Sequence, residues 1–258
     1  MTQVVILAGG LGTRLSEETN KIPKPMVEIG DQPILWHIMK IYESYGFKDF
    51  IICGGYKSSE IKKYFLNYNL INSDVDFNTS TGELKIIGGK SENWNVKVID
   101  TGEETMTGGR IKRVQKYVSK DNYFLMTYGD GLANVNVNEI VKFHNSHGKL
   151  ATVTAVQPEG RFGMLDINDG DSVINFYEKP AGDGGYINGG FFVLSPKIFE
   201  YIDGDQTIWE QEPMKNLSKD NQLNAFKHKG FWKPMDTLRD KNLLIDMWNK
   251  NSAPWKIW

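Results

Sequence analysis

Short apolar segments of strand length alternate with helical segments through the first 156 residues, and this alternation restricts the fold more than any other feature. The expected strands are residues 3–8, 49–53, 96–99, 123–128 and 150–156. The expected helices are residues 33–45, 57–65, 109–118 and 137–145. Because a helix that joins two neighbouring strands usually leaves them parallel, the pattern predicts an α/β fold with a mostly parallel central sheet.

The pattern changes after Pro158, where short strands are separated by glycine-rich turns. These strands are expected at residues 164–167, 173–178 and 187–194, and helices are expected near Pro196, Trp209 and Leu238. No Ser- or Pro-rich linker, charge block or internal repeat divides the two halves. We therefore expect one unit over residues 1–258, with a binding crevice at the carboxyl ends of the parallel strands.

Composition narrows the class of partner. The 258 residues include 30 Lys and Arg against 32 Asp and Glu, a net charge of −2, so no broad electrostatic field for nucleic acid or an anionic membrane is expected. No apolar stretch reaches the length of a membrane-spanning helix. Cys53 is the only cysteine, which excludes an intramolecular disulfide. We expect a cytoplasmic protein that binds neither nucleic acid nor membrane.

A glycine-rich loop follows the first strand. The absence of side chains at Gly9, Gly10 and Gly12 would let backbone N–H groups approach a polyphosphate, and Thr13 and Arg14 would add further donors. An ordinary strand-to-helix turn is the alternative. The dinucleotide fingerprint lacks its third glycine in register and the P-loop spacing is absent, so neither of those phosphate-binding motifs applies.

Several short motifs occur along the whole chain. LAGGLGTRL at residues 7–15 is followed by PKPM at residues 23–26, and then by YGDG at 128–131, EKP at 178–180, NGGFFVL at 188–194 and the late Asp236. These motifs and their order resemble those of the sugar nucleotidyltransferases. The resemblance implies a Rossmann-like central sheet with helices on both faces and an appended mixed sugar-binding part. It also implies a nucleotide-binding part over about residues 1–130 and a sugar-binding part over about 131–258.

Four further segments are similar to family members that use CTP and glucose 1-phosphate. They are MTGGR at 106–110, GRFG at 160–163, FWKPMDT at 231–237 and APWKIW at 253–258. The similarity implies a Mg²⁺-dependent, in-line attack of the sugar phosphate on the α-phosphate of CTP, which gives CDP-glucose and pyrophosphate. It also implies a homo-oligomer. Another NTP or another phosphorylated substrate remains open, as does a non-catalytic sensor of sugar nucleotides.

Two aspartates are the candidate metal ligands. Asp130 lies between two glycines at the end of an expected strand, and Mg²⁺ commonly takes one or two carboxylates with phosphate oxygens and water. Asp236 is the expected second ligand. The alternatives are an Asx-type turn at Asp130 and a helix N-cap at Asp236.

Lys24 and Arg14 are the candidate catalytic cations. Two prolines flank Lys24 and stiffen its backbone, so its ammonium could bridge the two phosphates as negative charge builds up. Arg14 is expected to bind the departing pyrophosphate. A solvated lysine in a Pro-rich loop is the alternative for Lys24.

The resemblance assigns the remaining site residues to two groups. The sugar phosphate is expected to contact Tyr128, Gly163, Glu178, Lys179 and Asn188. The nucleotide is expected to contact Leu7, Ala8, Gly9, Gly10, Gly12, Thr13, Arg14, Lys24, Met106, Thr107, Gly108, Arg110 and Asp130. The alternative for residues 106–110 is a plain helix N-terminus, and the alternative for Glu178 with Lys179 is an exposed ion pair.

Overall fold

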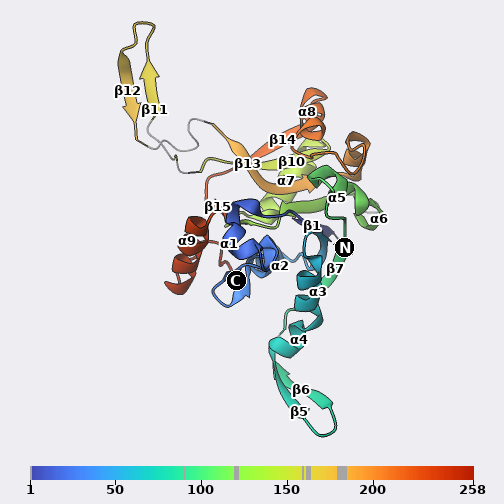
Figure 1. The fold of residues 1–258 in the computed structure, drawn as a ribbon. Coiled ribbons are helices and arrows are strands. Elements are labelled where there is room, and N and C mark those ends of the chain that lie inside the picture. Colours follow the sequence, from blue (N-terminus) through green and yellow to red (C-terminus); the bar gives the residue numbers. More distant parts are fainter. Residues whose placement is uncertain (1, 90, 119–121, 159, 161–163, 179–184) are drawn as a thin grey trace.

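The structure is a computed structural model that describes residues 2–89, 91–118, 122–158, 160, 164–178 and 185–258 (Figure 1). A seven-stranded sheet forms its centre, in the order β14-β10-β13-β8-β1-β4-β7. These strands are β1 (Gln3–Ala8), β4 (Asp49–Gly54), β7 (Asn95–Asp100), β8 (Phe124–Tyr128), β10 (Ala151–Val156), β13 (Ile187–Leu194) and β14 (Leu223–His228). Strands from both halves of the chain therefore share one sheet.

Most neighbouring strands in this sheet are parallel. β1 runs parallel to β4 and β8, β4 to β7, and β10 to β14, whereas β13 is antiparallel to both of its neighbours. The predicted α/β fold with a mostly parallel sheet is confirmed. The antiparallel insertion of β13 between β8 and β10 brings the NGGFFVL segment beside the strand that ends in Tyr128.

Helices cover both faces of the sheet. In β1, Val4 and Ile6 belong to one buried cluster while Val5 and Leu7 belong to the other, as the two-residue period of a strand requires. The first cluster includes residues of α2 (Ile34–Glu43), α3 (Ser58–Leu66), α7 (Val137–His147) and α9 (Leu238–Asn249). The second includes residues of α5 (Thr107–Arg113), α6 (Gln115–Val118), η4 (Pro196–Tyr201) and α8 (Glu212–Lys219).

Two hairpins project from this body (Figure 1). One consists of β5 (Ser73–Asn78) and β6 (Glu83–Gly89), and the other of β11 (Met164–Ile167) and β12 (Val173–Tyr177). The short remaining elements are η1 (Thr13–Leu15), α1 (Ser16–Thr19), η2 (Lys24–Met26), β2 (Glu28–Ile29), β3 (Gln32–Pro33), α4 (Tyr68–Ile71), β9 (Gly131–Ala133) and β15 (Trp232–Pro234). Within the described ranges, no helix combines the length and apolarity needed to cross a membrane.

Two helix predictions need correction. The expected helix over residues 109–118 is two short helices, because the chain leaves helical geometry at Val114, with ψ near 3°. The helix expected near Trp209 begins only at Glu212, where Pro213 lies in its first turn. Trp209 itself is fully buried in the preceding turn.

Candidate active site

The carboxyl ends of three parallel strands meet at one edge of the sheet. Leu7 of β1 pairs with Tyr128 of β8 and with Cys53 of β4, so the segments that follow these strands lie next to one another. Gly129 N donates a hydrogen bond to Leu7 O at 3.0 Å, which extends the backbone bonding between β1 and β8 by one residue. The predicted glycine loop and the YGDG segment therefore share one edge, as expected for an α/β crevice.

A small two-stranded ladder carries Asp236 to the same edge. β15 pairs antiparallel with β9, so that Pro234 lies opposite Gly131. Met235 N then donates to Asp130 O at 2.8 Å. Because Asp130 precedes one strand of the ladder and Asp236 follows the other, the two carboxylates converge although 106 residues separate them along the chain.

Lys24 lies between the two aspartates. Its Nζ is 2.6 Å from Oδ2 of Asp130 and 2.7 Å from Oδ1 of Asp236. Lys24 is only 8% exposed and forms the first residue of η2 after Pro23. The alternative of a solvated lysine is therefore wrong. The N-cap of α9 is Thr237, in a capping box with Asp240, so the N-cap alternative for Asp236 is also wrong.

The pair of carboxylates fits a divalent cation. Both already contact one positive group, and carboxylate oxygens are the ligands that Mg²⁺ prefers. Among the described residues, no three His, Cys, Asp or Glu side chains form a metal-ligating group. A cation held by Asp130 and Asp236 would thus take further ligands from phosphate oxygens and water, which is the usual arrangement for Mg²⁺ in phosphate-binding sites.

Arg110 forms a hydrogen bond with the backbone at the start of the glycine loop. It is 4% exposed, and its guanidinium donates five hydrogen bonds within the protein. The acceptors are Gly9 O at 2.9 Å, Gly54 O at 3.3 Å, Gly102 O at 2.7 Å, Glu103 O at 3.1 Å and Thr101 Oγ1 at 2.9 Å. A Cβ added at Gly9 would lie 2.1 Å from Nη1 of Arg110. Arg110, which we expected close to the nucleotide, therefore fixes the backbone of the loop.

The MTGGR segment begins α5. Met106 is the N-cap and is exposed, and Thr107 is the first helical residue, so the segment is a helix N-terminus as well as a candidate base site. Gly108 is buried because a neighbouring loop approaches it closely, and a Cβ there would lie 2.7 Å from Thr207 O. The N-terminal end of α5 is thus held by the loop that contains Thr207.

Tyr128 and Asn188, both expected to contact the sugar phosphate, lie in contact with each other. Asn188 Nδ2 donates to the Tyr128 hydroxyl at 3.1 Å, and that hydroxyl donates to Oε1 of Glu210 at 2.6 Å. Burial and the Glu210 carboxylate raise the pKa of the Tyr128 phenol, so the hydroxyl remains protonated. Sequence reasoning missed Glu210, because nothing in TIWEQEP separates this glutamate from an ordinary surface residue.

The remaining predicted site residues differ in burial and position. Leu7 and Ala8 are buried at the end of β1, Gly10 is exposed in the loop, Thr13 is exposed at the start of η1, and Gly12 has a φ of 64°. Glu178 is exposed directly after β12. Gly163, Lys179 and the side chain of Arg14 lie outside the described part of the structure.

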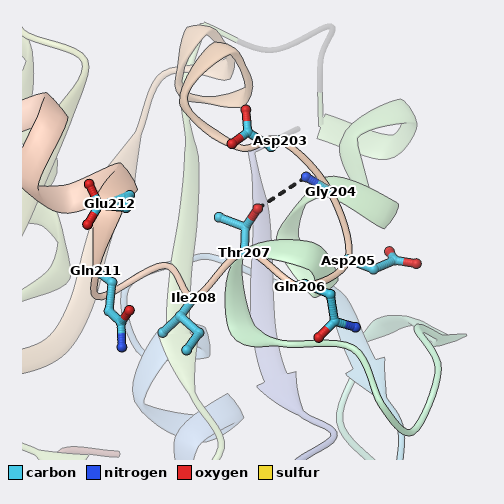
Figure 2. Close-up of a pocket in the computed structure, with 8 residues that line it drawn as sticks. All are labelled: Asp203, Gly204, Asp205, Gln206, Thr207, Ile208, Gln211 and Glu212. Carbon is cyan, nitrogen blue, oxygen red and sulfur yellow. Dashed lines mark hydrogen bonds between the residues drawn. The ribbon is translucent and has the colours of Figure 1, made fainter.

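A hollow of about 580 Å³ opens on the loop before α8 (Figure 2). Its walls are Asp203, Gly204, Asp205, Gln206, Thr207, Ile208, Gln211 and Glu212. None of these is a predicted site residue, and the convergent cation and carboxylates lie elsewhere. We therefore place the candidate active site at Lys24 and its two aspartates rather than in this hollow.

Known proteins resemble the chain over its full length. A family model described as "Nucleotidyl transferase" matches residues 3–238. Glucose-1-phosphate cytidylyltransferase of Salmonella typhimurium is 57% identical over 256 residues, which cover 99% of each chain. The probable glucose-1-phosphate cytidylyltransferase of Bacillus subtilis is 47% identical over 257 residues, covering 99% of this chain and 100% of the relative.

Solved structures agree with this relationship. HddC from Yersinia pseudotuberculosis superposes with a TM-score of 0.70 at 28% identity, over 96% of this chain and 100% of that protein. UDP-glucose pyrophosphorylase complexed with UDP-glucose, at 15% identity and a TM-score of 0.68 over 97% of this chain and 99% of its own, shares the fold. Because the family model matches residues 3–238 of its 258 residues, the chain belongs to the nucleotidyl transferase family.

Proposed function

We propose that this chain transfers the cytidylyl group of CTP to α-D-glucose 1-phosphate, which forms CDP-glucose and releases pyrophosphate. The observation that carries the proposal is the contact of Lys24 Nζ with Asp130 and Asp236 at the edge where the glycine loop begins. The choice of substrates follows the names of the relatives that are 57% and 47% identical to the chain.

The transfer reaction mainly requires positive charge near the phosphates and a fixed position for the reacting groups. A sugar phosphate is largely ionised at neutral pH, with a second pKa of about 6, so its oxygen can attack without a strong general base. Two polyanions must nevertheless approach each other, and this requires positive charge held in place. The buried ammonium of Lys24 provides such a charge, because its position is fixed by η2 and by two carboxylates.

Mg²⁺ is the proposed cofactor, and Asp130 with Asp236 would hold it. When bound, it would neutralise phosphate charge and align the α-phosphate for in-line displacement. The aspartates would orient the ion, while Lys24 would neutralise charge on the phosphate oxygens. Arg110 would keep the loop at Gly9 in the conformation that exposes its N–H groups.

The two halves of the chain would divide the substrates between them. We assign the triphosphate to residues 9–14, the base to residues 106–108, and the sugar phosphate to Tyr128, Gly163, Glu178, Lys179 and Asn188. The nucleotide part would cover about residues 1–130 and the sugar part about 131–258. Asp236 would complete the nucleotide part from the second half, as its ladder with the YGDG segment favours.

A matrix of four NTPs against several sugar 1-phosphates, with pyrophosphate release as the readout, tests this proposal. CTP with glucose 1-phosphate should give the highest kcat/KM. Highest activity with another pair would keep the reaction and replace the substrates. Silence across the whole matrix, together with tight binding of CDP-glucose, would replace the enzyme by a sugar-nucleotide sensor.

A homo-oligomer is part of the same proposal. Cross-strand pairs Val75 with Ile86 and Phe77 with Leu84 lie on one face of the β5–β6 hairpin, and all four side chains are at least 43% exposed. An isolated two-stranded hairpin is marginally stable in water, and an exposed apolar face of this kind favours burial against another molecule. A second copy of the chain is the proposed partner. The buried free thiol of Cys53 supports a cytoplasmic location.

A further inference from the structure

Glu210 joins the two substrate sides of the crevice. Its Oε1 accepts a hydrogen bond from the Tyr128 hydroxyl at 2.6 Å, and its Oε2 accepts one from Thr107 Oγ1 at 2.7 Å. Thr107 belongs to the segment proposed for the base, and Tyr128 belongs to the segment proposed for the sugar. One carboxylate therefore contacts both, although neither lies near it in the sequence.

The carboxylate also sets the direction of the hydrogen bonds beyond it. An ionised carboxylate only accepts, so the Tyr128 hydroxyl must donate to Glu210 and can accept from Asn188. Asn188 Nδ2 makes that second bond at 3.1 Å, and Asn188 Oδ1 accepts from Gly190 N at 2.8 Å. Glu210 thereby helps to determine which way round the Asn188 amide lies.

The loop that carries Glu210 is firmly attached. Trp209 is fully buried beside it, and Trp209 N donates to Thr107 Oγ1 at 2.9 Å. Thr207 closes the preceding turn by accepting a hydrogen bond from Gly204 N at 3.1 Å (Figure 2). Two backbone bonds then join the loop to the start of α5: Met106 N to Asp205 O at 2.8 Å and Gly109 N to Thr207 O at 3.2 Å. The exposed Glu210 carboxylate therefore lies on a loop whose backbone is held by these hydrogen bonds.

We infer that Glu210 is a positioning residue for the sugar phosphate, which acts by fixing the Tyr128 hydroxyl and, through it, the Asn188 amide. The inference rests on the proposed function for the identity of the substrate. It gives Glu210 a function in sugar binding that an ordinary surface glutamate lacks, because two hydroxyl groups from distant segments donate to it.

Glu210→Gln tests this inference kinetically. Glutamine keeps the shape of the side chain, but its amide nitrogen cannot accept, so one of the two hydroxyls loses its acceptor. We expect kcat/KM for the sugar phosphate to fall about tenfold. KM for CTP should rise less than this, because Thr107 keeps its hydrogen bond from Trp209 N. In a Tyr128→Phe background, the same change should have little further effect, because the hydroxyl it acts through is gone.

Glu212→Gln is the matched control. Glu212 is exposed and forms an ion pair with Lys215, three residues further along α8. This variant should keep the parent kinetic parameters. Equal sugar-phosphate parameters for Glu210→Gln and Glu212→Gln would overturn the inference, as would fully additive effects of Glu210→Gln and Tyr128→Phe.

A second measurement does not depend on activity. The side-chain amide signals of Asn188 in ¹⁵N-labelled protein without substrate, assigned by their loss in Asn188→Asp, should shift in Glu210→Gln and stay in place in Glu212→Gln. Unshifted signals in both variants would overturn the inference. Shifted signals in an enzyme inactive with every substrate pair would refute the proposed function and leave the hydrogen-bond chain standing.

Discussion

Arg110 is a buried cation whose guanidinium joins Gly9 O of the glycine loop to groups at the end of β4 and in residues 101–103 after β7. Arg110→Lys replaces a five-donor fork by an ammonium with three donors, so buried carbonyl groups lose partners. We expect the free energy of unfolding in urea to fall by about 3 kcal/mol and KM for CTP to rise.

Arg113→Lys is the control for this prediction. Arg113 lies in the same helix, but it is exposed and pairs with the surface carboxylate of Asp205. Arg113→Lys should lower the free energy of unfolding by less than about 1 kcal/mol. Equal losses of stability for the two variants would contradict the function assigned to Arg110.

His37 is held in its neutral form. Its Nε2 lies 2.9 Å from Ile29 O as donor, and its Nδ1 accepts from the Trp255 indole at 3.3 Å. Burial lowers the pKa of His37 from 6.5 to about 4. Between these values the unfolded chain binds more protons than the folded chain, so stability falls as the pH is lowered.

We therefore expect the free energy of unfolding to drop by about 2 kcal/mol between pH 7 and pH 5 on account of His37. Urea unfolding at the two pH values measures the drop, and His37→Gln should show a smaller one. Part of the loss should persist in that variant, because burial also lowers the pKa of His144 to about 4. An unchanged drop in His37→Gln would be the contrary result.

The residues of the candidate active site were predictable where they belong to a recognisable sequence motif. Lys24, Asp130 and Asp236 were expected together and lie in contact. The hydrogen bonds of Arg110 and Glu210 were not predictable. Their partners are up to about a hundred residues away, and no local sequence pattern around either residue indicates the pairing. Such contacts appear only once the strand order is known.

At the scale of elements, α9 begins directly after Asp236. Thr237 caps the helix by accepting from Asp240 N, and the Asp240 carboxylate accepts from Thr237 N. Thr237→Ala removes one half of this capping box and should lower stability by about 1 kcal/mol. It should also reduce kcat, because the residue that fixes the backbone next to Asp236 changes.

Asn136→Ala provides the control for Thr237→Ala. Asn136 caps α7 by accepting from Glu139 N at 3.2 Å, and it is not among the proposed site residues. Urea unfolding should show a similar loss of stability in the two variants, whereas steady-state kinetics should show a lower kcat only in Thr237→Ala. A kcat lowered equally in both would refute the link between this cap and the site.

Several strands were predictable almost to the residue. β1, β11 and β13 have the expected bounds, and β4 and β8 differ by one residue. β5, β6 and β14 were missed, because all three mix polar and apolar residues, and β5 and β6 are also largely exposed. The strand period alone cannot separate such segments from loops.

At the scale of the whole molecule, the alternation of strands and helices predicted the parallel part of the sheet but not its full order. The antiparallel β13 lies between β8 and β10, and no local pattern distinguishes it from a parallel strand. This position matters for function, since it places Asn188 beside Tyr128. The proposed sugar side of the site therefore depends on topology.

The exposed hairpin face leads to a prediction about assembly. The 29.3 kDa chain should sediment as an oligomer, and Phe77→Lys with Ile86→Lys should shift it toward the monomer, because charges would then replace the apolar contacts proposed between copies. Asp76→Asn with Lys85→Gln changes the opposite face of the same hairpin and should leave the oligomer intact. A monomeric parent protein would contradict the proposed assembly.

The most direct test of the active site is the turnover of Asp130→Asn and Asp236→Asn in the release of pyrophosphate from CTP and glucose 1-phosphate. Each change removes a charged ligand from the proposed cation site, so kcat should fall at least about a hundredfold while urea unfolding shows that the fold survives. Asp246→Asn, which alters a surface pair with Lys250, should turn over normally. Near-normal kcat in both active-site variants would contradict the site described for this chain.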